Sequence, residues 1–292
     1  MKNNLPYLIN IPPFLLKDLK ETDLSFYSKL FLILKGKFFG FVIKFFNGNI
    51  FCYIMNCFFR NDGKIFFKEG KYLKLTNNKV KLFYPNKRVL RVMRNAESHL
   101  DRIYQSYCIE SIGLKNGDTV IDCGANIGEL NLAIKNKKVD INYIGFEPEL
   151  ITFECLKLNV SEKNDKLINK ALSDSNEVKK LYLDSYGGNS SLESFGSSDY
   201  IEIETIKLDE FETPTKIKLL KIEAEGHEPE VLRGAVNTLG KTKYISVDFG
   251  AERGEDEDYT IVDVNQFLYE NNFKLIEFSE YRFIGLYENT SI

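Results

Sequence analysis

The chain has 292 residues, of which 43% are hydrophobic, so a packed core is affordable and wholesale disorder is excluded. The formal net charge of −3 argues against nucleic acid as the main partner. Five scattered cysteines without a C-x-x-C pair indicate reduced thiols in a cytoplasmic protein rather than a disulfide framework.

Residues 1–95 predict a small β-rich accessory region. Neither a secretory signal nor an apolar run of about 18 residues, the length of a membrane span, is found there. Its Phe-rich part is interpreted as core or homodimer interface. Asn77-Asn78 predicts a hairpin turn, because Asn tolerates positive φ. Aromatic and β-branched residues predict strands at Phe41–Phe46, Phe51–Phe59, Lys64–Phe67, Lys71–Thr76 and Val80–Tyr84.

Residues 96–292 predict one α/β domain. Apolar residues recur at three- and four-residue steps from Ala96 to Ile112, which indicates an amphipathic helix. Strands and helices then alternate, which is typical of a mostly parallel sheet covered on both faces. The expected strands are Thr119–Cys123, Tyr143–Phe146, Lys166–Leu172, Leu219–Ile222, Tyr244–Phe249, Phe273–Phe278 and Phe283–Tyr287, the last two antiparallel, with helices at Ile127–Lys135, Phe153–Val160, Glu230–Leu239 and Ile261–Asn271.

The first candidate site follows the strand at 119–123, where Gly124 and Gly128 let a backbone approach a ligand closely. The helix beginning there offers free N–H groups. The spacing is G-x-x-x-G rather than the dinucleotide G-x-G-x-x-G, and Asp122 would repel a phosphate. The turn therefore favours a cationic ligand, with an ordinary strand-to-helix turn as the alternative.

A second acid, Glu147, ends the next strand about 25 residues after Asp122. An acid near this spacing can accept hydrogen bonds from ribose hydroxyls. Pro148 suits the first turn of a helix, so Glu147 alone would be interpreted as a helix-opening acid. Paired with the glycine turn, it favours a nucleoside.

A third cluster follows the strand at 219–222 and contains Glu223, Glu225 and His227. Ligands of open α/β sheets bind beyond the carboxyl ends of the strands. His227 is a candidate general base, since imidazole titrates near neutral pH. Glu223 and Glu225 would orient it or bind substrate. The alternative is a solvated charged loop that opens a helix.

Together these segments resemble the FkbM-type methyltransferases. The matching stretches are Asp122-Cys123-Gly124-Ala125-Asn126-Ile127-Gly128, Phe146-Glu147-Pro148, and Lys221 to Glu228 with Val231-Leu232-Arg233-Gly234-Ala235. Their order and spacing agree over roughly residues 96–287. The family's usual Asp at the end of the fourth strand is Glu223 here, which puts the role of that position in question.

The resemblance implies a class I methyltransferase (Rossmann-like) fold with a seven-stranded, mostly parallel sheet whose last strand is antiparallel. It also implies S-adenosylmethionine as cofactor and a hydroxyl of a sugar, polysaccharide precursor or natural product as acceptor. Asp122, Gly124 and Asn126 would line the methionine end, with Gly128 in the same turn, Glu147 on the ribose, and Ser173 and Asp174 near the adenine. Asp248, Glu252 and Arg253 would bind substrate.

Three functions remain open at this stage. The first is S-adenosylmethionine-dependent O-methylation in the cytoplasm, without nucleic acid or a membrane span. The second is a nicotinamide-dependent oxidoreductase, disfavoured by the missing third glycine. The third is a non-catalytic S-adenosylmethionine-binding module. No metal is expected, since no His-rich ligand spacing is present.

Overall fold

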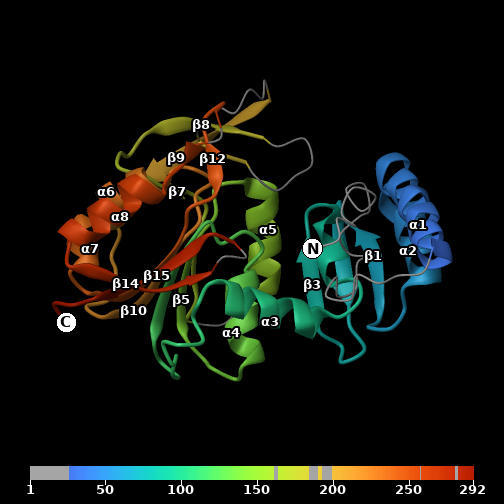
Figure 1. The fold of residues 1–292 in the computed structure, drawn as a ribbon, viewed down its shortest axis with the longest axis horizontal. Helices are drawn as coiled ribbons and strands as arrows, with labels where there is room; N and C mark the ends of the chain where they lie inside the picture. Colours follow the sequence, from blue (N-terminus) through green and yellow to red (C-terminus); the bar gives the residue numbers. More distant parts are fainter. Residues whose placement is uncertain (1–25, 161–163, 184–189, 193–198, 257, 280–281) are drawn as a thin grey trace. The chain divides into compact units, whose positions relative to one another are not determined.

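A computed structural model describes residues 26–160, 164–183, 190–192, 199–256, 258–279 and 282–292 of the chain (Figure 1). The chain forms two compact units, Met1–Ala96 and Glu97–Ile292.

Unit 1 combines two helices with a three-stranded antiparallel sheet in the order β1-β2-β3. Phe39 and Val42 of the first helix and Phe51 and Met55 of the second are buried. The elements are α1 (Phe26–Phe45), α2 (Gly48–Phe58), β1 (Lys64–Lys68), β2 (Lys71–Leu75), β3 (Lys81–Tyr84) and the 3-10 helix η2 (Lys87–Val92).

The prediction of strands at 41–46 and 51–59 is wrong, because these residues are helical except Phe46 and Phe59, the last residue of each range. Aromatic content favoured strands, but Phe51, Met55 and Phe59 are buried at four-residue steps, which is a helical period. The remaining three strands are confirmed. Lys79, rather than an Asn, takes the positive φ of 64° in the β2–β3 turn.

Unit 2 is built on a seven-stranded sheet in the order β14-β15-β11-β10-β4-β5-β6. The five strands from β11 to β6 are parallel, and β15 runs antiparallel to both of its neighbours. This is the class I methyltransferase, Rossmann-like arrangement. The strands are β4 (Thr119–Cys123), β5 (Asn142–Phe146), β6 (Lys166–Ile168), β10 (Ile217–Ile222), β11 (Thr242–Asp248), β14 (Phe273–Ser279) and β15 (Ile284–Asn289).

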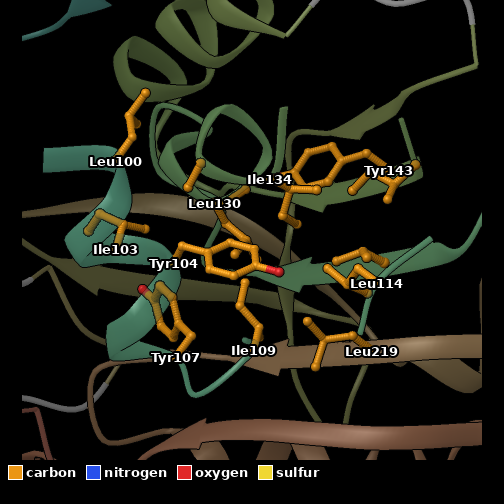
Figure 2. Packing of buried hydrophobic residues seen from close by; sticks show 14 of the residues in the cluster. Leu100, Ile103, Tyr104, Tyr107, Ile109, Leu114, Leu130, Ile134, Tyr143 and Leu219 are labelled. Atoms are coloured by element: carbon orange, nitrogen blue, oxygen red, sulfur yellow. The ribbon is translucent and has the colours of Figure 1, made fainter. Parts of the chain in front are cut away.

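Helices cover both faces of this sheet (Figure 1). They are needed on both, because successive apolar side chains of β4 point to opposite faces of the sheet and are all buried. Val120 packs with α3 (Ala96–Ser106), α4 (Glu129–Asn136) and α5 (Leu150–Asn159) in one core cluster, part of which Figure 2 shows. Ile121 and Cys123 pack on the other face in a cluster that includes α6 (Glu228–Arg233), α7 (Val236–Leu239) and α8 (Ile261–Glu270).

Small elements beyond the main sheet depart from the expected pattern. The single strand expected at 166–172 is divided between β6 and β7 (Ala171–Leu172), which lie in different sheets. β7 pairs with β9, which also pairs with β8. The other bounds are β8 (Val178–Tyr182), β9 (Tyr200–Ile206), η3 (Leu208–Glu210), β12 (Ala251–Arg253) and β13 (Asp258–Tyr259).

The helix expected at 230–239 is two short helices separated at Gly234 and Ala235. The backbone of Gly234 passes so close to Ser173 that a Cβ would overlap the Ser173 carbonyl oxygen. Glycine is therefore required here by packing against the chain that follows β7.

We expect Gly234→Ala to destabilise the protein by about 1–3 kcal/mol, the usual cost of overpacking a site that cannot relax. Urea denaturation followed by circular dichroism measures the change.

Gly240→Ala is the matched control. A Cβ at Gly240 has Asn237 O at 3.5 Å as its nearest neighbour, so the free energy of unfolding should stay within about 1 kcal/mol of wild type. Equal losses in both variants would refute the packing explanation.

Candidate active site

A cluster of charged side chains gathers at the carboxyl edge of the parallel strands of unit 2. The register places Asp122 of β4 beside Lys221 of β10. Glu223 follows β10 directly, and Asp248 ends β11. Ligands of open α/β sheets bind beyond this edge, so the cluster is the candidate active site.

Lys221 is the buried centre of the cluster. Its Nζ lies 2.9 Å from Asp122 Oδ1 and 3.2 Å from Glu223 Oε2. It also donates to the carbonyl oxygens of Cys123 at 3.0 Å and Gly124 at 2.8 Å. Burial alone would lower the pKa of Lys221, but the negative charges of Asp122 and Glu223 hold it well above its usual value. The ammonium therefore stays charged.

Asp122 is only 1% exposed, and both of its oxygens face protein groups. Oδ2 accepts a 2.6 Å hydrogen bond from the Tyr143 hydroxyl, and Oδ1 faces Lys221. In this arrangement Asp122 positions Lys221 and the turn. The role that the family resemblance implies for Asp122, at the methionine end of the cofactor, stays a prediction.

The two glycines of the turn are required by the fold itself. Both have positive φ, 73° at Gly124 and 88° at Gly128. A Cβ on Gly124 would overlap the Glu223 carbonyl oxygen, and one on Gly128 would lie 2.5 Å from Val160 Cγ2. The glycine pattern therefore brings β4 against the end of β10 and α4 against α5, which is a different reason from ligand approach.

Tyr107 and Arg282 complete the cluster, and the sequence analysis assigned neither to the site. The Tyr107 hydroxyl donates to Glu223 Oε2, and the Arg282 guanidinium donates to Glu223 Oε1. Arg282 also lies 5.0 Å from the centre of the Tyr107 ring. Burial would raise the pKa of Glu223, but Lys221 and then Arg282 hold it below its usual value. Glu223 is thus an ionised, fixed group.

The acids on β11 and β12 are less well compensated. Asp248 Oδ1 accepts from the Gly250 N–H at 2.9 Å, and Oδ2 lies 3.7 Å from Arg282. Burial, and then the charge of Glu223, raise the pKa of Asp248 to about 8. The same two causes act on Glu252, whose pKa is also raised, although a hydrogen bond with Glu225 lowers it. Carboxyl groups therefore outnumber the cations Lys221 and Arg282 at this edge.

Glu147 lies one strand away, at the end of β5. Its Oε2 accepts from the Asn126 N–H at 2.8 Å, and Oε1 accepts from the Glu149 N–H at 2.9 Å. Burial raises the pKa of Glu147 to about 7. A carboxylate has about four acceptor positions, so two remain for a ligand hydroxyl. Asn126 itself has a φ of 49°, and its side-chain oxygen accepts from Ile127 N–H.

His227 has different neighbours from those expected. Its Nε2 lies 2.9 Å from Ser173 Oγ and its Nδ1 lies 3.5 Å from Glu230 Oε2, and the residue is 3% exposed. Glu223 and Glu225 were expected to orient His227 or to bind substrate. Glu223 contacts Lys221, Tyr107 and Arg282, whereas the ring nitrogens of His227 lie beside Ser173 and Glu230.

Two further residues that were expected at the site, Arg253 and Asp174, are bound to other protein groups. Arg253 makes two hydrogen bonds of 2.9 Å to Glu230 and one of 2.7 Å to the Gly226 carbonyl. Asp174 lies 3.4 Å from Arg233 and 4.0 Å from Lys179. Arg253, expected on the substrate, is therefore engaged with protein groups.

The part of the chain that the structure describes shows no metal-binding cluster. No group of three or more His, Cys, Asp or Glu side chains that could hold a metal ion is present among those residues.

Comparisons with known proteins give one family and several distant relatives. The family described as Methyltransferase FkbM domain matches residues 122–275. The curated protein Methyltransferase sdnD of Sordaria araneosa is 26% identical over 171 residues, which cover 45% of this chain and 66% of that protein, just under two thirds of its length.

Two solved methyltransferase structures are also similar. A SAM-dependent methyltransferase from Aquifex aeolicus is 15% identical, with a TM-score of 0.38 over 66% of this chain and 97% of that one. Precorrin-6y C5,15-methyltransferase from Geobacter metallireducens GS-15 is 12% identical, with a TM-score of 0.36 over 63% and 88%. The strand order of the seven-stranded sheet in unit 2 defines the fold.

The family match begins at Asp122 and ends within β14, so it contains the glycine turn, Glu147, Lys221, Glu223 and Asp248. It covers more than half of the chain. The chain therefore belongs to the FkbM methyltransferase domain family.

Proposed function

We propose that the protein is an S-adenosylmethionine-dependent O-methyltransferase that acts on a hydroxyl of a sugar or nucleotide-sugar, in polysaccharide or natural-product biosynthesis. The observation that carries the proposal is the surplus of carboxyl groups over cations at the ends of β10 and β11. Lys221 and Arg282 face four acids there, namely Asp122, Glu223, Asp248 and Glu252. The family's common acceptors support the sugar hydroxyl.

The surplus fits a cationic ligand. Asp248 and Glu252 have raised pKa values because burial and Glu223 disfavour their ionised forms. A cation beside them would relieve that repulsion. S-adenosylmethionine carries an ammonium and a sulfonium, whereas the pyrophosphate of NAD would meet like charge. This separates the proposal from the nicotinamide-dependent alternative.

Glu147 fits the nucleoside part. Its two free acceptor positions suit ribose hydroxyls, and the Asn126 and Glu149 N–H groups hold the carboxylate in place. Glu228 adds a further acceptor, since its Oε2 is buried without a hydrogen-bond partner within the described residues. Ser173 and Asp174 are the proposed residues near the adenine.

Asp248 is the proposed general base. When bound, the donor supplies a methyl group on its sulfonium, and the acceptor hydroxyl must lose its proton. A carboxylate with a pKa of about 8 is matched to that task near neutral pH. Glu223, which Lys221 and Arg282 hold ionised, orients Arg282 beside Asp248. His227 would then act by holding Ser173, not by taking the proton.

The first prediction concerns Glu147 and S-adenosylhomocysteine. We expect calorimetry to detect this product and not NAD. Because hydroxyl donors need the ionised carboxylate and the pKa is about 7, affinity should rise with pH from 6 to 8. Glu147→Gln should weaken binding by about 1–3 kcal/mol and reduce this pH dependence, with Glu228, whose pKa is also raised to about 7, causing the remainder.

Glu154→Gln on α5 is the matched control, since Glu154 pairs with exposed Lys157 outside the cluster. It should bind like wild type at each pH. Binding of NAD without any S-adenosyl ligand would overturn the proposed function. An unchanged dissociation constant in folded Glu147→Gln would show that Glu147 only opens the helix.

The second prediction concerns Asp248. Asp248→Asn should lower turnover by about 10²–10⁴-fold, the range for loss of a general base, while S-adenosylhomocysteine still binds. In wild type, kcat/KM should rise with pH and level off above about 8, because only ionised Asp248 accepts the proton. Rates against pH with a sugar acceptor measure both.

Asp263→Asn, on the exposed side of α8, should keep the wild-type rate. His227→Ala tests the competing base. If His227→Ala loses 10²–10⁴-fold in turnover and Asp248→Asn does not, His227 is the base. S-adenosylmethionine binding without turnover on any hydroxyl acceptor would instead favour the non-catalytic module.

A further inference from the structure

The two units carry opposite charge. Residues 1–96 contain 18 Lys and Arg against 5 Asp and Glu, whereas residues 97–292 contain 21 against 37. The net charge of −3 conceals this division. Unit 1 therefore favours an anionic partner, while the proposed chemistry lies in the acidic unit.

The helical part of unit 1 lacks acids altogether. From Leu24 to Asn61 the sequence contains Lys29, Lys35, Lys37, Lys44 and Arg60 but no Asp or Glu. The segment includes all of α1 and α2. Its charge is therefore uniformly positive.

One side of α1 is apolar and exposed. We call aromatic face the set Phe31, Leu34, Phe38, Phe41 and Phe45 of α1 together with Phe58 of α2, which are 45–68% exposed. The α1 members recur at alternating steps of three and four residues, so they share one side of the helix.

The aromatic face is continuous and its opposite side is packed. Phe38 contacts Phe58 with ring centroids 5.6 Å apart, and Phe41 contacts Phe45 at 4.8 Å. On the other side of α1, Phe39 and Val42 are 1% exposed. Phe39 and Val42 therefore pack α1 into unit 1, and the aromatic face is left largely exposed to solvent.

Exposed lysines lie along the edge of the aromatic face. Lys37 is three residues after Leu34 and four before Phe41, and Lys44 is three after Phe41, so both neighbour the face on the helix surface. Long lysine side chains can reach headgroups while apolar neighbours enter the acyl region.

We propose that the aromatic face binds the surface of an anionic lipid bilayer. Phe and Leu would enter the headgroup boundary, and the lysines would pair with lipid phosphates. No helix among the described residues is long and apolar enough to cross a membrane. In the proposed complex α1 lies in the plane of the bilayer surface, because the aromatic face runs along the side of the helix. Two copies joined through this face would bring like charges together, which disfavours a homodimer.

Vesicle flotation of the full chain tests the proposal. Wild type should bind vesicles of phosphatidylcholine mixed with phosphatidylglycerol, bind pure phosphatidylcholine weakly, and dissociate with added salt. The variant F31S/F41S should lower the partition coefficient by at least about tenfold per side chain, since burial of a Phe contributes that much or more. Lys37→Glu with Lys44→Glu should lower binding to anionic vesicles.

The matched control is V262S/Y269S on α8, whose side chains are equally exposed in unit 2. It should bind like wild type. The chain has no Trp, so Phe41→Trp introduces a single fluorophore whose emission should shift to the blue on anionic vesicles. Tyr269→Trp should show no shift.

Three results would overturn the proposal. The first is absence of binding to anionic vesicles. The second is binding that F31S/F41S leaves unchanged. The third is a wild-type dimer that F31S/F41S converts to monomer while vesicles are ignored, which would make the aromatic face a contact between copies.

Discussion

The candidate site depends on one buried ammonium group. Lys221 is 2% exposed and would be costly to bury alone, so four oxygens around it must offset the lost hydration. Two of them are the main-chain carbonyls of Cys123 and Gly124, and two are the carboxylates of Asp122 and Glu223. One side chain thereby ties the end of β4, the glycine turn and the end of β10 together. Without it, the carboxylate of Asp122 would remain buried beside no cation that the structure pairs with it.

This arrangement leaves charge unevenly distributed along the same edge. Lys221 and Arg282 neutralise Asp122 and Glu223 most directly. Asp248 lies 3.7 Å from Arg282, and both Asp248 and Glu252 have raised pKa values. A site prepared in this way attracts a cation and keeps a carboxyl group near its titration point. Charge is also unevenly divided between the two units. The basic unit 1 favours an anionic partner and the acidic unit 2 favours a cationic one.

Periodicity predicted the elements better than composition did. The alternation of apolar strands and helices after residue 113 predicted the main sheet and its antiparallel last strand, because each element must bury one face. Composition failed at α1 and α2, where Phe favoured strands although the buried residues follow a helical period. It also missed β8 and β9, whose side chains are mostly exposed or half-buried and give a weak apolar signal. The break at Gly234 depends on the approach of Ser173, which no local pattern contains.

The sequence by itself determined which acids reach the active edge. Asp122, Glu147, Glu223 and Asp248 each stand at or directly after a strand end, and parallel strands bring their carboxyl ends to one edge. Only the tertiary structure decided their partners. Tyr107 and Arg282 are 116 and 59 residues from Glu223, yet both bind it, and His227 contacts Ser173, which lies 54 residues away. Such pairings follow from strand register and helix packing, which join segments that are distant along the chain, and a local pattern does not encode them.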